Sequence, residues 1–263
     1  MIHLHPGLAF PTLKHAYRVQ IEAASRYVVL DPSFKRLLEQ KLYKGVPHPN
    51  IVCIENPMPD RQVTLEQKNK TVLFVGRLIR SSKRVDRLLK MWKIMEPLHQ
   101  DWSLTIVGDG PDKARLVGLS NQLNLERVEF TGTQPASAYY KTASILCLTS
   151  SFEGMPLVVR EAQQYGTVPL VYDCSPAMKN LIENRVDGII VQAFKQKQFV
   201  HALDQLMSDD GYLKKMSLNA HQSIKVKCKD HLEVVGNKWL ALLEELEHNT
   251  GNSPKSTTTQ TFI

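Results

Sequence analysis

Residues 152–162 read FEGMPLVVREA and join a short apolar run, SILCL at 144–148, to a stretch with helical periodicity. This order predicts a buried strand, a turn and the start of a helix. We expect the helix to begin near Met155, with Pro156 in its first turn, where the missing N–H costs nothing. Gly154 allows a ligand to approach the backbone closely.

The predicted helix start suits a polar ligand. Free N–H groups and the positive end of the helix dipole attract a phosphate or a polar ring. Glu153 lies in the turn and Glu161 follows two helical turns later, so the carboxylates stand about 10 Å apart. That is too far for a retaining-hydrolase pair at about 5 Å, and it suits the two ends of one extended ligand. The alternative is that Glu153 only stabilises the helix start and Glu161 is a solvated helix residue.

Composition places the chain among ordinary globular proteins. Its 263 residues are 43% hydrophobic, enough for one large or two modest domains. It has no apolar run of 18 residues, and MIHLHPGLAF does not resemble a signal peptide, so we expect a cytoplasmic protein.

The net charge of +7, partly in Lys214 to Lys229, favours a phosphorylated ligand or a peripheral contact with the inner face of a membrane. Nucleic acid is a weaker option, since no recognition motif accompanies the charge.

The four cysteines are scattered, without a C-x-x-C pair. They are Cys53, Cys147, Cys174 and Cys228. We expect buried free thiols in a reducing compartment; the alternatives are a metal site or disulfides.

From Thr71 onward, apolar runs alternate regularly with helical patterns. The runs are TVLFVG at 71–76, SLTIVG at 103–108, RVEFTG at 127–132, SILCLT at 144–149, TVPLVY at 167–172 and GIIVQ at 188–192. Near-continuous apolar strands at this spacing predict a parallel sheet covered on both faces. Right-handed crossovers then give a doubly wound, Rossmann-like α/β domain.

The flanking segments are less regular. Before residue 57 we expect helices at 14–24 and 31–43 and strands at 26–30 and from 51, with Asp31 as the cap of the second helix. A domain boundary is expected between 57 and 70. After the sheet come helical stretches at 198–207, 211–229 and 231–248, and then a Thr-rich tail, 249–263, which we expect to be disordered.

Four strand-to-helix loops carry polar or glycine-rich sequence. They are GRLIRSSK at 76–83, GDGP at 108–111, TGTQP at 131–135 and SSFEGMP at 150–156. In a doubly wound sheet such loops converge on one cleft. Arg77 and Lys83 of the first loop could clamp a diphosphate, although both could equally be solvated loop cations. Gly108-Asp109-Gly110 resembles the start of the G-x-G-x-x-G dinucleotide fingerprint, but it is followed by Pro111 and lacks the third glycine. No P-loop sequence is present either. These two observations argue against a dehydrogenase and an ATPase, respectively.

These motifs together resemble a known family. VGRL followed by Lys83, VGDGP, VEFTG, FEGMPLVVREA, and GTVPLV with GIIV are similar to the carboxyl-terminal, donor-binding domain of a family 4 glycosyltransferase of the GT-B fold. The resemblance is strong over residues 72–191. It implies retaining transfer of a sugar from a nucleotide-sugar donor, usually a UDP-sugar, to a glycan or lipid-linked acceptor, with no cofactor and no obligatory metal. Polysaccharide biosynthesis is the associated role.

The resemblance also implies roles for individual residues. Arg77 and Lys83 would hold the diphosphate and stabilise the departing nucleotide, Glu153 would face the donor sugar, and Glu161 would accept hydrogen bonds from the ribose. Arg77, Lys83 and Glu153 are therefore the expected catalytic residues. The remaining expected donor contacts are Gly76, Val128, Thr131, Gly132, Gly154, Met155, Pro156 and Leu157.

The chain departs from the family in three places. Arg84 stands where many members have glycine, and CSPAMKNLI at 174–182 lacks the usual glycine pair and acidic residue. Only the end of an amino-terminal domain fits before Asn56, because such a domain needs about 150 residues. No catalytic role is assigned to His3 or His5, which are more simply loop residues.

The expected organisation follows from this comparison with the family. Residues 1–57 are a remnant of the amino-terminal domain with its hinge, 58–230 the donor domain, 231–248 a helix that crosses back, and 249–263 a tail. One alternative is a truncated, catalytically silent donor-binding module that needs a separate amino-terminal half. Independently of this alternative, a homodimer could form if the cleft surface, which lacks its partner domain, leaves an apolar patch unpaired. A phosphorylase of the same fold would need a cofactor lysine site, which the sequence does not display.

Overall fold

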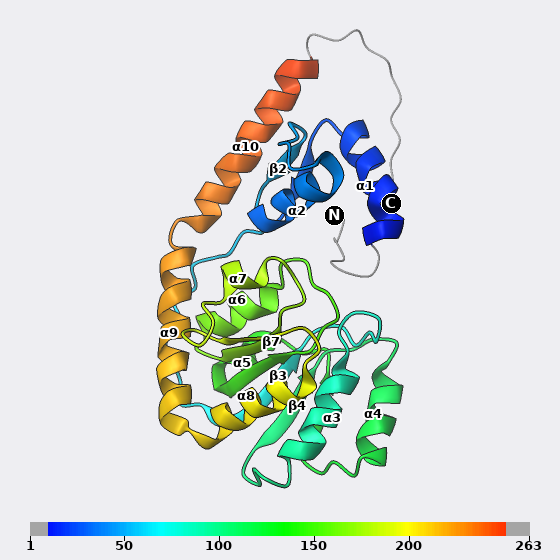
Figure 1. Cartoon of the computed structure of the whole chain (residues 1–263). Coiled ribbons are helices and arrows are strands. Elements are labelled where there is room, and N and C mark those ends of the chain that lie inside the picture. The colour runs from blue at the N-terminus through cyan, green and yellow to red at the C-terminus, as the bar shows by residue number, and fades with distance from the viewer. Residues whose placement is uncertain (1–9, 251–263) are drawn as a thin grey trace.

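The structure is a computed structural model that describes residues 10–250, with side chains described from 14 to 248. It contains a large and a small parallel sheet, joined by a linker and by two long helices near the end of the chain (Figure 1). His3, His5 and most of the predicted tail lie outside the described residues. The last helix, α10 (His231–Thr250), includes Asn249 and Thr250, the first two residues of the predicted tail.

The large sheet has six parallel strands. They are β3 (Asn69–Val75), β4 (Ser103–Val107), β5 (Val128–Gly132), β6 (Ala143–Leu148), β7 (Val168–Tyr172) and β8 (Ile189–Val191). Their order in space is β5-β4-β3-β6-β7-β8, which is the order of a doubly wound sheet with its reversal between β3 and β6. The predicted Rossmann-like α/β fold is confirmed.

Helices cover both faces of this sheet. They are α3 (Val85–Met95), α4 (Lys113–Gln122), α5 (Ala136–Thr142), α6 (Leu157–Gln164), α7 (Met178–Leu181), α8 (Gln196–Ser208) and α9 (Asp210–Cys228). Val72 and Phe74 of β3 share one core with Trp92 of α3 and Phe199 of α8, whereas Leu73 points to a second core with α5 and α6. Successive residues of one strand are thus buried on opposite faces, which explains the unbroken apolar runs.

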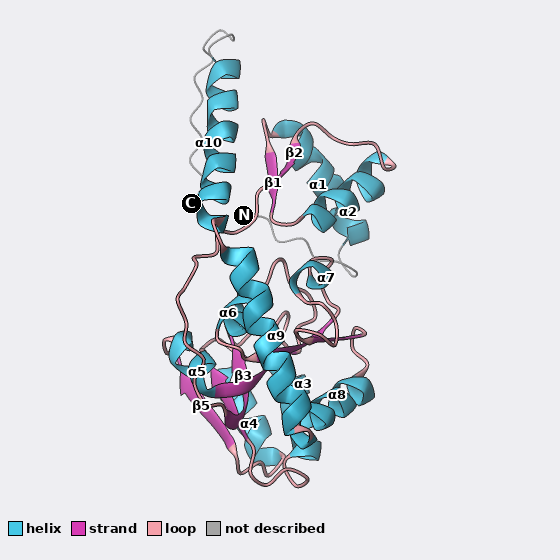
Figure 2. Cartoon of the chain, turned by 90° about the vertical axis from the view of Figure 1, so that its left-hand side faces the viewer, coloured by secondary structure: helices cyan, strands magenta, loops and turns pink. Residues whose placement is uncertain are grey.

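The small unit has three layers. Helices α1 (Phe10–Ala23) and α2 (Pro32–Tyr43) lie on one side of the parallel strands β1 (Tyr27–Val29) and β2 (Ile51–Cys53), and α10 lies on the other side (Figure 2). Asp31 caps α2 as predicted, because its carboxylate accepts a hydrogen bond from the Ser33 N–H at 2.7 Å. Each strand has only three residues, so β2 ends well before the proline-rich segment.

Helix α10 reaches the small sheet because the chain turns at Lys229 and Asp230. Asp230, between α9 and α10, has a φ of 56°, which breaks the helix and redirects it. Val235 and Leu242 of α10 then pack against Ile54 in a small core that also includes side chains of β1 and β2. The carboxyl-terminal helix therefore connects the two sheets physically.

Polar contacts fix the junction between the two sheets. The Asn180 side chain donates to both carboxylate oxygens of Asp31, at 2.8 and 3.0 Å. In the linker, Glu55 accepts from Nε2 of His231 at 3.2 Å and pairs with Arg160 at 3.5 Å. Burial alone would raise the pKa of Glu55, but the His231 hydrogen bond and the Arg160 charge hold that pKa below its usual range.

The junction makes a testable contribution to stability. A carboxylate whose pKa is lowered on folding stabilises the fold above its unfolded pKa, and loses that contribution as the pH falls through its folded pKa. We expect Glu55→Gln to lower the free energy of unfolding by roughly 1 kcal/mol at pH 7. Between about pH 5 and 3, the free energy of unfolding of the variant should decrease less steeply than that of the parent chain. Urea unfolding across this range measures both effects, and an unchanged profile would contradict the assignment.

Candidate functional site

Three glycine-containing loops meet at the carboxyl edge of the large sheet. The Gly76 N–H donates to the Val107 carbonyl at 3.0 Å, and the Gly108 N–H donates to the Gly132 carbonyl at 2.8 Å. Gly108 has a φ of 138°, and a Cβ on it would stand 2.0 Å from the Gly76 oxygen. No other residue type fits at this position without displacing a loop.

A groove opens beside these loops, with a volume of about 510 Å³. Its lining includes Gly76, Arg77, Asp109, Gly110, Thr133 and Gln134. Arg77 is exposed, and among the described side chains it has no ion-pair partner. The groove therefore offers an uncommitted guanidinium next to backbone groups, as an anionic ligand requires.

Lys83 and Glu153 meet across two neighbouring loops. The first follows β3 and the second follows β6, and these strands are paired in the sheet. The Lys83 ammonium donates to the Glu153 carboxylate at 2.7 Å, and the Ser150 hydroxyl donates to the same oxygen at 2.6 Å. Glu153 is buried and Lys83 is partly buried, so both groups are held in place before any ligand arrives. Two predicted site residues are thus in direct contact.

Backbone contacts support this pair. The Ser151 N–H donates to the Ser82 carbonyl at 2.7 Å, which joins the two loops directly. The Ser175 hydroxyl donates to the Gly154 carbonyl at 2.7 Å and fixes the next turn. The sequence does not predict a role for Ser175, and the only sign of a role for Ser150 is its position in the SSFEG loop.

Helix α6 begins at Leu157, two residues later than predicted. Pro156 is its cap, with extended backbone at φ −71° and ψ 104°, and Met155 is buried in the main core. The expected start near Met155 is therefore two residues too early, because the backbone of Pro156 is still extended. Glu161 stands about one turn into the helix instead of two.

The Glu161 carboxylate accepts a hydrogen bond from the Tyr140 hydroxyl at 3.1 Å. Burial raises the pKa of the Tyr140 hydroxyl most, and the negative charge of Glu161 raises this pKa further. The Tyr140 hydroxyl therefore keeps its proton and donates it to the hydrogen bond. Glu161 is half-buried, so it is not simply a solvated helix residue. Its second oxygen leaves acceptor capacity for a ligand.

The β5 residues divide between the two ends of the strand. Gly132 ends β5 at the edge where the loops meet, and Thr131 precedes it with its hydroxyl turned towards the Gly132 carbonyl at 3.2 Å. Val128 begins β5, pairs with Leu104 and packs against the main core. The structure thus brings Thr131 and Gly132 to the candidate site but leaves Val128 at the opposite end of the strand.

Arg84 explains one departure from the family pattern. It adopts a left-handed conformation with φ 50° at the cap of α3, which is where a glycine is favoured. Its guanidinium makes two hydrogen bonds of 2.9 Å to the buried carboxylate of Asp86. The paired charge compensates for the strained backbone, so the fold tolerates an arginine here.

Residues 10–250 show neither a metal-binding cluster nor a membrane-spanning helix. They contain no group of three or more His, Cys, Asp or Glu side chains placed to hold a metal ion. None of their helices is long and apolar enough to cross a membrane. The four cysteines are free, as predicted. Cys147, Cys174 and Cys228 are also buried, whereas Cys53 is only partly buried.

Comparison with known proteins gives the family. The family model for glycosyl transferases group 1 matches residues 59–223, which is more than half of the chain. The chain belongs to this family. The match covers the whole large sheet and every loop of the candidate site.

Relatives and solved structures agree with this family. An uncharacterized glycosyltransferase of Haemophilus influenzae is 32% identical over 229 residues, which cover 85% of this chain and 62% of that protein. A Campylobacter jejuni enzyme named for transfer of N-acetyl-D-galactosamine to an undecaprenol-linked glycan is 27% identical over 69% of this chain and 50% of its own length. A crystal structure of mutant TarM from S. aureus, bound to fondaparinux, α-GlcNAc-glycerol and UDP, superposes with a TM-score of 0.78 at 21% identity, over 92% of this chain and 49% of TarM.

These comparisons confirm the fold as that of the GT-B glycosyltransferases. The chain spans about half to two thirds of the length of the proteins named above. The expected membrane contact of the lysines in 214–229 stays a prediction.

Proposed function

We propose that the groove and the Lys83–Glu153 pair bind a nucleotide-sugar donor, a UDP-sugar, and that the protein transfers the sugar with retention of configuration. The observation that carries this proposal is the 2.7 Å contact between Lys83 and Glu153, beside a groove that contains Arg77. Arg77 and Lys83 would supply the cations for a diphosphate, and Glu153 would supply a carboxylate for a sugar, all at one edge of the sheet. The group 1 match over these loops supports it.

The chemistry requires stabilisation of a departing diphosphate. The bond between the sugar carbon and the diphosphate oxygen breaks, the acceptor oxygen bonds to that carbon on the same face, and the hydroxyl proton leaves with the diphosphate. Arg77 and Lys83 would balance the growing negative charge. Since the Lys83 ammonium has three donors, it can keep its bond to Glu153 and still contact a phosphate. Glu153 would then face the sugar and Glu161 the ribose.

The domain assignment belongs to the same proposal. Residues 58–230 would form the donor domain, residues 1–57 the end of an acceptor-side domain, and α10 the helix that crosses back. The contacts of α10 with the core around Ile54 support this arrangement. A glycan or lipid-linked acceptor is proposed because the Campylobacter relative is named for one.

A transfer assay tests the function. The purified protein would be mixed with radiolabelled UDP-galactose, UDP-glucose or their N-acetylamino forms and with undecaprenyl-diphosphate-linked glycans. We expect an α-linked product from an α-linked donor, established by the NMR coupling constant of the new anomeric proton. Activity should survive EDTA, because Arg77 and Lys83 would neutralise the diphosphate in the proposed site without a metal. A product with inverted configuration would refute the retaining mechanism. Loss of activity in EDTA would refute transfer without a metal.

Glu153→Gln should separate binding from turnover. Removing the carboxylate charge beside Lys83 leaves the ammonium free for the diphosphate, so we expect UDP to bind about three- to tenfold more tightly, which is the scale of roughly 1 kcal/mol. Turnover should fall by about 100-fold, because the group facing the sugar loses its charge. Glu66→Gln, on the exposed linker, is the matched control. Weaker UDP binding in Glu153→Gln would show that Lys83 does not serve the diphosphate.

A further inference from the structure

Tyr140 of α5 is held in place at its ring and at its backbone. It is 1% exposed, and its ring stacks on that of Tyr165 in the second core, with the ring centroids 6.0 Å apart. Its carbonyl accepts hydrogen bonds from the Thr167 hydroxyl at 2.6 Å and from the Lys68 ammonium at 2.8 Å. The core of the protein therefore fixes the position of the Tyr140 hydroxyl before any ligand binds.

That hydroxyl is directed at the Glu161 carboxylate. It donates to Oε2 of Glu161 at 3.1 Å, and the described residues include no lysine, arginine or histidine that forms an ion pair with this carboxylate. Helices α5 and α6 both follow strands of the parallel sheet, so both begin at its carboxyl edge. Side chains of a helix lean towards its amino end, so Tyr140 and Glu161 lean towards the edge where the candidate site lies.

The hydrogen bond determines which orientation of Glu161 a ligand meets. A glutamate side chain rotates about three bonds, and a ligand that binds it must stop this rotation at a cost in entropy. Because Tyr140 engages Oε2, that rotation is restricted in advance and Oε1 remains available as an acceptor. An acceptor oriented in this way favours a ligand that offers hydroxyl donors.

We propose that Tyr140 is a positioning residue, which holds Glu161 in the orientation that binds the ribose and so makes the site selective for a nucleotide with ribose hydroxyls. The inference rests on the proposed function, in which Glu161 accepts hydrogen bonds from the ribose of the donor. Tyr140 acts through Glu161 and does not touch the nucleotide. An analogue without the hydroxyls is rejected because it leaves the carboxylate unpaired.

Calorimetric titration with UDP and with 2′,3′-dideoxy-UDP tests this selectivity. The parent chain should bind UDP about 10- to 150-fold more tightly than the analogue, the range for hydrogen bonds to a charged group. Tyr140→Phe should weaken UDP binding by about 3- to 10-fold and leave binding of the analogue unchanged, because Glu161 is no longer oriented. Tyr165→Phe is the matched control, since it removes a hydroxyl from the neighbouring ring, and it should keep the preference of the parent.

A double-mutant cycle separates positioning from a structural role. Glu161→Ala should bind UDP and the analogue almost equally, and addition of Tyr140→Phe should then change neither affinity, because Tyr140 acts only through Glu161. The stoichiometry of each titration reports the folded fraction of the sample. Partial unfolding would lower that stoichiometry without changing the ratio of the two affinities.

The outcomes distinguish this inference from the proposed function. If Tyr140→Phe keeps the preference of the parent, or if it weakens UDP binding further in the Glu161→Ala chain, Tyr140 does not position Glu161 and the inference is overturned, while UDP binding stands. Equal binding of UDP and the analogue by the parent chain would overturn it as well, because Glu161 would then not bind the ribose. A parent chain that binds no UDP would contradict the proposed function itself.

Discussion

Replacing Lys83 with alanine is expected to weaken UDP binding by about 1.5–3 kcal/mol, the range for hydrogen bonds to charged groups. The loss has two physical sources. The diphosphate loses a cation, and the buried Glu153 carboxylate loses its 2.7 Å partner and then repels the phosphates. Isothermal titration calorimetry should show an increase in Kd of about 10- to 150-fold.

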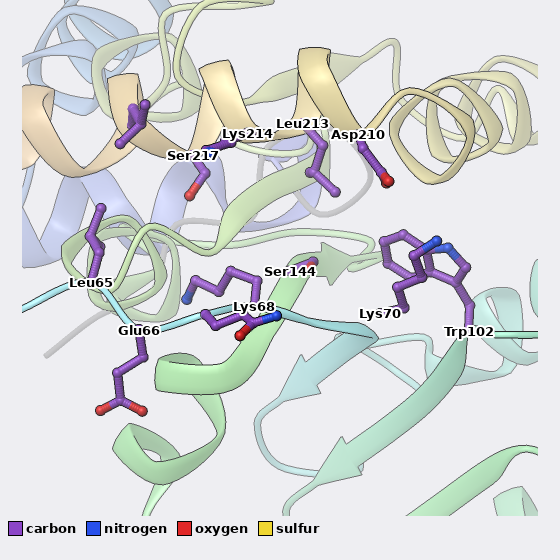
Figure 3. Close-up of a pocket in the computed structure, with 12 residues that line it drawn as sticks. Leu65, Glu66, Lys68, Lys70, Trp102, Ser144, Asp210, Leu213, Lys214 and Ser217 are labelled. Carbon is purple, nitrogen blue, oxygen red and sulfur yellow. The ribbon is translucent and has the colours of Figure 1, made fainter.

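A double mutant separates these two sources. Lys83→Ala combined with Glu153→Gln should bind UDP more tightly than Lys83→Ala alone, because the repulsive charge is gone. Lys70→Ala is the matched control. Lys70 lies near the amino end of β3, where it lines a different pocket (Figure 3), and it pairs with Asp101 on the surface. Equal binding by Lys83→Ala and the parent would remove Lys83 from the donor site.

Gly108→Ala is expected to lower the free energy of unfolding by about 2–4 kcal/mol, the scale of overpacking combined with a strained backbone. The added Cβ would stand 2.0 Å from the Gly76 carbonyl, at a φ of 138° that disfavours alanine. The loops after β3 and β4 must then separate, which also distorts the groove that contains Arg77. Urea unfolding measures the first effect and UDP titration the second.

Gly118→Ala is the control for this substitution. Gly118 lies inside α4, and a Cβ there would meet nothing within 4 Å. Alanine should stabilise the chain by up to about 1 kcal/mol through helix propensity and leave UDP binding unchanged. Equal stability of Gly108→Ala and Gly118→Ala would show that the close contact between Gly108 and Gly76 is dispensable.

The sequence was sufficient to predict the large sheet, because its strands are buried on both faces. Val72, Leu73 and Phe74 are all fully buried, so the run is apolar without alternation and easily recognised. The rule that loops after parallel strands converge then placed Lys83 and Glu153 at one edge. Their direct contact could not be predicted, since it joins positions 70 residues apart and depends on side-chain geometry.

Other features escaped prediction for local reasons. Met155 fits the helix pattern in the sequence, but the extended backbone of Pro156 places the start of α6 at Leu157. Val128 was assigned to the site by family resemblance, whereas strand direction leaves it at the amino end of β5.

Calorimetric titration of the protein with UDP, ADP and GDP tests the central claim most directly. The account predicts saturable 1:1 binding of UDP, weaker or absent binding of the other two, and loss of UDP affinity in both Lys83→Ala and Glu161→Ala. Because only the nucleotide is added, the result does not depend on the identity of the acceptor. UDP binding that is undetectable in the parent, or identical in the parent and both variants, would contradict a nucleotide-sugar site at this edge of the sheet.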